Sequence, residues 1–103
     1  MKASLSPRAI RDLLEATEAI AGYSRRAARE FRVSVDDALT MIGRHPEIGA
    51  ERRELADPPV RFWTLTRHNY LMVYNSSRNP PRILQVVHGA RDLPALLSGL
   101  RSD

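Results

Sequence analysis

The run from residue 83 to residue 88, with the letters I-L-Q-V-V-H, is the feature that most constrains the fold. Its apolar residues occupy consecutive positions, and successive side chains of a strand point to opposite faces. A strand that is apolar on both faces belongs inside a covered sheet. Gly89 ends the run, and His88, Arg91 and Asp92 lie where the chain leaves it. We therefore expect a central strand that delivers polar groups to one edge of the sheet.

Two helical patterns precede this strand. Ser6 and Pro7 indicate a helix start, because serine caps the first turn and proline is well suited to the first helical position. The apolar positions that follow are spaced by three and four residues: Ile10, Leu13, Leu14, Thr17, Ile20 and Ala21. Ser24 caps a second helix, which Pro46 ends. Two amphipathic helices joined by a short link predict an antiparallel hairpin.

Strand-like segments fill the second half of the chain. We expect strands at residues 60–66, 70–75 and 82–88, a short edge strand at residues 2–5, and a short helix within residues 92–100 that Asp92 caps. These elements predict a single α+β domain over residues 1–103. Its architecture is an N-terminal helical hairpin packed on a small antiparallel β-sheet, with a short C-terminal helix.

Composition excludes several classes of site. The 103 residues are 43% hydrophobic, which fits one domain with one core, and the absence of cysteine excludes disulfides and thiolate metal sites. His45 and His68 lack the spacing of metal ligands, and no glycine-rich phosphate loop is present, so we expect no metal and no other cofactor. No apolar run approaches the length of a membrane span. We therefore expect a cytoplasmic protein without a membrane partner.

The charge of the chain is distinctly basic. The net charge is +4, and arginine carries most of the positive charge. Because arginine binds phosphate and carboxylate groups through paired hydrogen bonds, the excess predicts an anionic partner, either nucleic acid or an acidic protein. The alternative is a basic surface that only keeps the chain soluble.

The predicted strands carry more apolar surface than one helical hairpin can cover. Both faces of each strand are largely apolar or aromatic, whereas an antiparallel sheet usually exposes one polar face to water. We expect a second polypeptide on the face made by Trp63, Leu65, Tyr70, Met72, Tyr74, Leu84 and Val86. The alternative is that the C-terminal helix and a second copy of the chain close this face.

Six short segments carry a resemblance to a known family, in the same order and with the same spacing. They are L-S-P-x-A-x-x-D-L from Leu5, R-H-P-E-I-G from Arg44, R-E-L from Arg53, V-R-F from Val60, Y-L-M-V-Y from Tyr70 and V-V-H-G-A-R-D-L from Val86. Together they resemble the RelE/ParE superfamily of bacterial type II toxin–antitoxin toxins, whose fold is a helical hairpin on an antiparallel sheet. The resemblance implies a toxin held inactive by a cognate antitoxin, a ParD-like or related small ribbon-helix-helix protein.

Two activities occur in this superfamily, and the resemblance favours one of them. ParE-like members inhibit DNA gyrase, whereas RelE-like members cut mRNA on the ribosome and use a tyrosine near the C-terminus. Past Asp92 the chain has no tyrosine, histidine or lysine, and its H-G-A-R-D-L segment is typical of ParE-like chains. The resemblance therefore implies a gyrase inhibitor with no assigned catalytic residue, in which Arg61, Arg67, His88 and Arg91 face the target.

Two alternatives stay open. An mRNA endoribonuclease would use His88 with Glu54 or Glu51 for proton transfer and Arg61 or Arg91 for the phosphate. A non-toxic interaction module, or a degenerate toxin, is the second alternative. The same residues also have structural interpretations, in which His88 bonds the turn that it enters and Arg61 pairs with Asp12 or Glu54.

Overall fold

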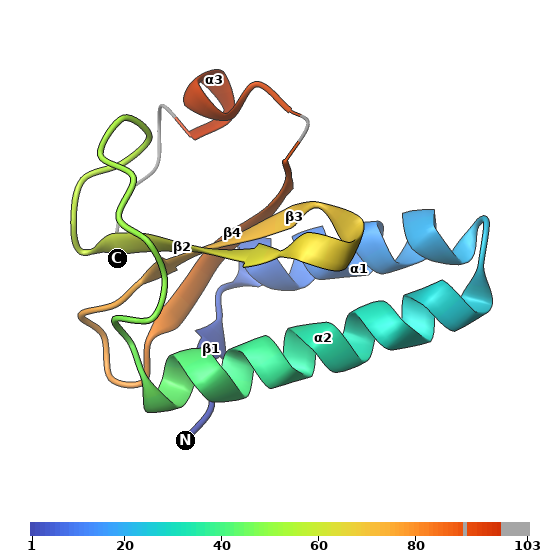
Figure 1. Ribbon diagram of the computed structural model, residues 1–103, viewed down its shortest axis with the longest axis horizontal. Helices are drawn as coiled ribbons and strands as arrows, with labels where there is room; N and C mark the ends of the chain where they lie inside the picture. The colour runs from blue at the N-terminus through green and yellow to red at the C-terminus, as the bar shows by residue number, and fades with distance from the viewer. Residues whose placement is uncertain (90, 98–103) are drawn as a thin grey trace.

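Two long helices lie side by side on one face of a four-stranded sheet, and a third, short helix lies on the other side (Figure 1). The computed structural model describes residues 1–89 and 91–97. In chain order the elements are β1 (Ser4–Leu5), α1 (Pro7–Ala21), α2 (Arg25–Arg44), β2 (Val60–Leu65), η1 (Thr66–His68), β3 (Tyr70–Asn75), β4 (Arg82–His88) and α3 (Leu93–Leu97). The predicted α+β architecture is confirmed. The part of the predicted C-terminal helix beyond Leu97 lies outside the described residues.

Both predicted helix starts are confirmed by their caps. The Ser6 side chain accepts a hydrogen bond from the Ala9 N–H at 3.0 Å, and Pro7 occupies the first helical position. Ser24 accepts from the Ala27 N–H at 3.0 Å in the same way. Ser6 also donates its hydroxyl proton to the carbonyl of Leu84 at 2.9 Å, so the start of α1 is fixed to β4.

The sheet has the strand order β1-β4-β3-β2, with β1 parallel to β4 and the other neighbours antiparallel. Val73 pairs with Gln85 and Tyr74 pairs with Ile83, which leaves Leu84 as an extra residue in β4. The strict alternation predicted for this strand is therefore wrong. The bulge places Ile83 on the helix side of the sheet and Leu84 on the opposite side, each within a different buried cluster.

The two faces of the sheet are covered by different segments of the chain. The face toward α1 and α2 packs against Phe31 and Ile42, which are fully buried. The opposite face packs against Leu55 of the loop before β2 and against Leu97 of α3. The expectation of an open apolar face is therefore wrong for the described residues, because the loop and α3 cover the side that the hairpin leaves free.

The turn between β2 and β3 brings the ends of β3 and β4 together. Asn69 has a φ of 56°, and its carbonyl accepts a hydrogen bond from the Gly89 N–H at 2.7 Å. A Cβ at position 89 would lie 2.5 Å from the Asn69 side-chain oxygen and 3.2 Å from the Asn69 carbonyl oxygen, so any larger residue would have to displace the Asn69 side chain. The result is that His88 ends beside Tyr70, its partner in the sheet.

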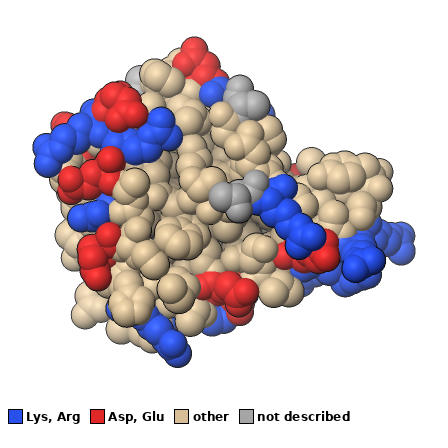
Figure 2. Space-filling view, viewed as in Figure 1, with Lys and Arg blue, Asp and Glu red and all other residues tan. Residues whose placement is uncertain are grey.

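Charged side chains form two different groups on the surface. Over the loop before β2, basic and acidic side chains alternate, whereas basic side chains gather near the free end of the helical hairpin (Figure 2). The first group contains Arg52 and Arg53 with their glutamate partners. The second contains the exposed arginines of the first half of α2.

Candidate functional site

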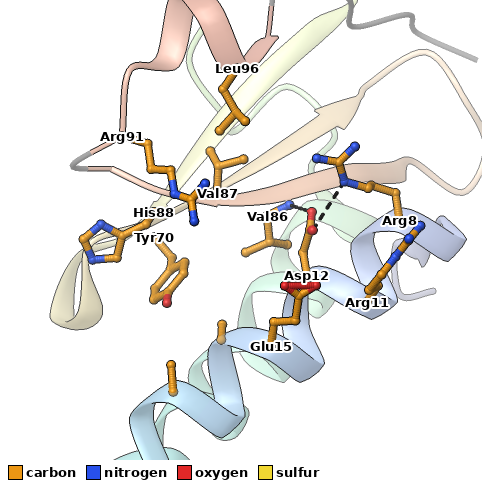
Figure 3. A pocket seen from close by; sticks show the side chains of 12 residues that line it. Arg8, Arg11, Asp12, Glu15, Tyr70, Val86, Val87, His88, Arg91 and Leu96 are labelled. Carbon is orange, nitrogen blue, oxygen red and sulfur yellow. Dashed lines mark hydrogen bonds and ion pairs between the residues drawn. The ribbon is translucent and has the colours of Figure 1, made fainter.

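A groove of about 490 Å³ lies between α1 and the end of β4 (Figure 3). We call it the α1–β4 groove. One wall comes from α1, the other from β4 and the segment after it. Its lining residues are Arg8, Arg11, Asp12, Glu15, Ala16, Ala19, Tyr70, Val86, Val87, His88, Arg91 and Leu96.

The α1 wall carries a row of charged residues. Arg8, Arg11 and Glu15 are spaced by three and four residues, so they lie on one side of the helix. Sequence reasoning did not assign these positions to a site, although their spacing opposite the apolar stripe was a usable signal. The groove therefore places two arginines on the wall that faces the end of β4.

Asp12 joins the two walls. Its carboxylate accepts a hydrogen bond from the Val86 N–H at 2.9 Å, and its other oxygen lies 3.4 Å from the Nε of Arg8. The pairing of Asp12 with Arg61, one of the structural alternatives, is not formed. Asp12 instead holds α1 against β4 and orients Arg8 along the rim of the groove.

His88 and Tyr70 form the floor at the far end of the groove. Their rings meet edge to face with centroids 4.9 Å apart, and the Tyr70 ring also packs against Phe31 at 5.4 Å. Burial raises the pKa of the Tyr70 hydroxyl, and Tyr23 adds to this rise, while Arg91 opposes it. Tyr70 therefore remains a neutral hydrogen-bonding group at physiological pH.

Arg91 stands on the wall opposite Arg8 and Arg11 (Figure 3). Arg91 follows the turn at Gly89. Its backbone N–H donates a hydrogen bond to the His88 carbonyl at 3.1 Å. Arginine side chains on both walls, with the His88 imidazole beyond Arg91 at the far end of the groove, suit contact with a carboxylate or phosphate group.

The four predicted target residues are not all brought together. His88 and Arg91 share the α1–β4 groove. Arg67 lies in the turn after β2 and is exposed, 4.0 Å from Glu30 of α2. Arg61 lies near the start of β2, where it pairs with Tyr74 near the end of β3. Tyr70 lies at the start of β3 and pairs with Leu65 at the end of β2. The prediction of one surface that includes Arg61 is therefore wrong.

Arg61 has a local role instead. It donates hydrogen bonds to the carbonyls of Gly49 at 2.8 Å and Glu47 at 3.1 Å, and it lies 3.6 Å from the carboxylate of Glu51. The expected pairing with Glu54 is not formed, because Glu54 pairs with Arg52 at 3.2 Å. Arg61 therefore fixes the loop after α2 to the sheet.

The residue set proposed for a ribonuclease is also divided. Glu54 and Arg61 lie with the loop at the start of β2, whereas His88 and Arg91 lie at the opposite end of the strands. No proton transfer between Glu54 and His88 is available in this arrangement. The carboxylates that do share the groove with His88 are Asp12, which bonds the Val86 N–H, and Glu15.

Most residues predicted to bind an antitoxin lie inside the chain. The buried members, with 0–6% of their surface exposed, are Leu65, Met72, Tyr74, Leu84 and Val86. Trp63 and Tyr70 are half-buried. The prediction of an exposed face made by these seven residues is wrong, because α1 and α2 cover all of them except Leu84, which the bulge turns to the other side.

Two smaller grooves flank α2. The first, of about 240 Å³, lies between α1 and α2, and we call it the α1–α2 groove. It is mainly apolar, with one arginine and one aspartate among its lining residues Leu13, Leu14, Thr17, Phe31, Arg32, Val35, Asp36 and Leu39. The second, of about 250 Å³, lies between α2 and the edge strand β2 and includes Met41, Trp63 and His68.

Neither a metal site nor a membrane segment is found in the described residues. Within residues 1–89 and 91–97, no three histidine, cysteine, aspartate or glutamate side chains gather closely enough to hold a metal ion. The helices of this same part of the chain are too short or too polar to cross a membrane.

The helical hairpin on a four-stranded sheet is also found in a solved structure. A solved structure described as the chromosomal ParDE TA system from P. aeruginosa matches this chain with a TM-score of 0.70. The match covers 85% of this chain and 95% of that chain at 18% sequence identity, so it shows the fold alone.

The family itself follows from the sequence model. The model of the ParE toxin of the type II toxin-antitoxin system, parDE, matches residues 3–93. The chain belongs to the ParE toxin family. A search of curated proteins found no match.

Proposed function

We propose that this chain is a toxin that inhibits DNA gyrase by protein–protein contact in the cytoplasm, and that a cognate antitoxin neutralises it. The observation that carries the proposal is the ParE toxin family match over residues 3–93. This range includes both walls of the α1–β4 groove, from Arg8 on α1 to Arg91 after β4.

The α1–β4 groove is the surface we assign to the target. Arginine and tyrosine are the residue types that most often dominate the energy of protein interfaces, and the groove presents both kinds together. Arg11 and Arg91 are exposed on opposite walls, and Tyr70 lies half-buried near Arg91 (Figure 3). Such a groove fits an acidic segment of gyrase, whose carboxylates the two arginines can bind.

Gyrase inhibition is tested by supercoiling of relaxed plasmid with purified toxin. We expect inhibition by the wild type, and a rise of about tenfold in the concentration for half inhibition with Arg91→Gln, as for the loss of one strong interface contact. Arg78→Gln is the matched control. Arg78 is equally an exposed arginine, but it lies in the β3–β4 connection at the opposite end of these strands, outside the groove.

If the wild type and Arg91→Gln inhibit gyrase equally, gyrase is still the target, but the α1–β4 groove is not the surface that binds it. Absence of any effect of the wild type on gyrase would reject the proposed function itself.

The α1–α2 groove is the surface we assign to the antitoxin. It is lined by apolar side chains, and the exposed Leu14 and Ile10 extend this surface along α1, with 60% and 47% of their area accessible. An amphipathic helix commonly binds such a groove through apolar residues at three- and four-residue spacing. Arg32 at the rim suits an acidic polar face on that helix.

The antitoxin surface is tested with a pair of exposed apolar residues. Leu14→Glu should weaken binding of the ParD-like antitoxin by at least about tenfold, because a charge would enter the apolar interface. Val33→Glu is the control, since Val33 is 61% exposed on α2 but does not line the groove. Isothermal titration calorimetry measures both. If the two variants lose equal affinity for the antitoxin, the antitoxin binds another face of the chain.

The ribonuclease alternative now depends on the groups that the groove brings together. His88, Arg91 and Glu15 line it, which supplies an imidazole, a cation and a carboxylate. A ribosome-programmed translation extract tests this alternative. Specific mRNA cleavage that His88→Ala lowers by about 100-fold or more, with gyrase unaffected, would replace the proposed function by ribonuclease activity.

A further inference from the structure

A row of three arginines runs along the solvent-facing side of α2. Arg25, Arg29 and Arg32 are spaced by four and three residues, so their side chains lie above one another on one side of the helix. All three are exposed. We call this surface the arginine row. It lies near the free end of the hairpin, where basic side chains gather in Figure 2.

The carboxylates near the arginine row are engaged with other cations. Glu30 pairs with Arg26 at 3.8 Å and lies 4.0 Å from Arg67, and Asp36 pairs with Lys2. Within residues 1–89 and 91–97, no carboxylate lies within 4.0 Å of a guanidinium nitrogen of the row. The positive charge of the row is therefore directed to solvent.

The loop before β2 provides an internal contrast. Arg52 lies 3.2 Å from Glu54, and Arg53 lies 3.7 Å from Glu51. Arg53 is exposed and Arg52 is partly exposed, yet each has a local counter-charge. The two groups therefore differ mainly in their counter-charges rather than in the number of arginines. Glutamates pair with the loop arginines, whereas no carboxylate of the described residues pairs within 4.0 Å with the arginine row.

We propose that the arginine row binds the phosphate backbone of duplex DNA. With a helical rise of 1.5 Å per residue, Arg25 and Arg32 are separated by about 10 Å along the axis. Each strand of a DNA duplex carries roughly three phosphate charges over this length, so one strand offers about one phosphate per arginine and the second strand adds roughly three more to the negative field. An acidic helical peptide with one carboxylate per turn on its facing side carries about two or three in all. Duplex DNA therefore supplies the charge density that a dense row of arginines can use.

The placement of the row allows contact with a duplex. The three arginines lie on one exposed side of a regular helix of 20 residues, and a duplex presents its phosphates on its outside. Arginine contacts of this kind position a protein on DNA without reading its sequence. We therefore assign to the row binding without sequence preference. The assignment goes beyond gyrase inhibition and does not depend on it, because the binding is measurable without gyrase.

The test uses fluorescence anisotropy with the full chain and a labelled duplex of about 20 base pairs, over about 50 to 200 mM salt. Arg29→Gln together with Arg32→Gln should weaken binding about tenfold or more at the lowest salt. It should also lower the slope of log affinity against log salt by about two, since each lost phosphate contact lowers it by about one. Arg52→Gln with Arg53→Gln is the control of equal charge change, and it should leave the slope nearly unchanged.

Thermal melting of both double variants checks that they are folded. If Arg29→Gln with Arg32→Gln is unstable, Arg25→Gln alone replaces it and should lower the slope of log affinity against log salt by about one. Equal weakening by the two double variants would overturn the proposal, because net charge alone would then explain the binding. Absence of wild-type binding at low salt would also overturn it. Three competitors test the choice of duplex DNA. Polyglutamate represents an acidic protein, and single-stranded DNA and duplex RNA represent other nucleic acids. Tighter binding of any of them than of the duplex would overturn the assignment to duplex DNA.

Discussion

Helices of 15 and 20 residues cover one face of the sheet, whereas a loop and a helix of 5 residues cover the other. On the first face, Phe31, Ile42, Met72 and Tyr74 are completely buried. On the second face, Leu97 is 2% exposed, although it belongs to a helix barely longer than one turn. Short helices have little stability of their own, so α3 depends on its contacts with the sheet. The hairpin face is therefore the stable part of the core, and the α3 face is the part that opens first.

The strongest test of this comparison is Phe31→Ala. Phe31 has no exposed surface. Its ring centroid lies 5.4 Å from that of Tyr70 and 5.5 Å from that of His68. The cavity left between α2 and the sheet should lower the free energy of unfolding by about 3 to 5 kcal/mol. Urea denaturation followed by circular dichroism measures it.

The matching change on the second face is Leu97→Ala. We expect a loss of about 2 kcal/mol, at the lower end for a buried leucine, because the short α3 can move to fill part of the space. Hydrogen exchange should show α3 amides less protected than those of α2 in the wild type. A loss as large as that of Phe31→Ala, or equal protection of the two helices, would contradict the comparison.

A smaller effect is expected for Tyr74→Phe. The Tyr74 hydroxyl donates to the Pro46 carbonyl at 2.7 Å and accepts from the Gly49 N–H at 2.8 Å, both in the loop after α2. Removing it leaves a buried donor and acceptor unpaired, which costs about 1 to 2 kcal/mol. Tyr23→Phe is the control, because Tyr23 is 73% exposed in the link between the helices, and it should change stability by less than about 0.5 kcal/mol.

The smallest effect concerns pH. Burial raises the pKa of Tyr74, more than the Gly49 hydrogen bond lowers it, and burial also raises the pKa of Tyr70. A pKa raised in the folded state means that the contribution to stability is complete below pH 10, the ordinary pKa of tyrosine, and is lost as pH rises through the folded-state pKa. Absorbance at alkaline pH should show Tyr70 and Tyr74 ionising above pH 10, the ordinary pKa of tyrosine, and stability should fall only above about pH 10. Ionisation of both groups at pH 10 would show that the hairpin face is open to water.

The sequence predicted those features that local chemistry determines. Ser6 with Pro7, and Ser24, marked the helix starts because a capping side chain acts within three residues of its partner. Asp92 was predicted as the cap of the last helix, and its side chain accepts from the Ala95 N–H at 3.4 Å. Each of these is decided by neighbouring residues, so a single sequence suffices.

The features that the sequence did not predict depend on contacts between distant segments. The extra residue Leu84 in β4 follows from the register against β3, which no local pattern reveals. Arg61 binds the carbonyls of Glu47 and Gly49, and a backbone acceptor leaves no signal in the sequence. The spacing of Arg8 and Arg11 on α1 was visible in the sequence, but they become site residues only when Asp12 docks α1 against Val86.

The attachment of α1 to β4 has a consequence for the order in which the chain is made. The bond from Ser6 to Leu84 spans 78 residues, and the bond between Asp12 and Val86 spans 74. At a synthesis rate of about 5 to 20 residues per second, α1 waits roughly 4 to 15 seconds for its docking strand. The two helices that form the α1–α2 groove are complete long before β4 is translated. The surface proposed for the antitoxin is thus translated first and the surface proposed for the target last, so on that proposal a new chain presents its antitoxin surface before its target surface is complete.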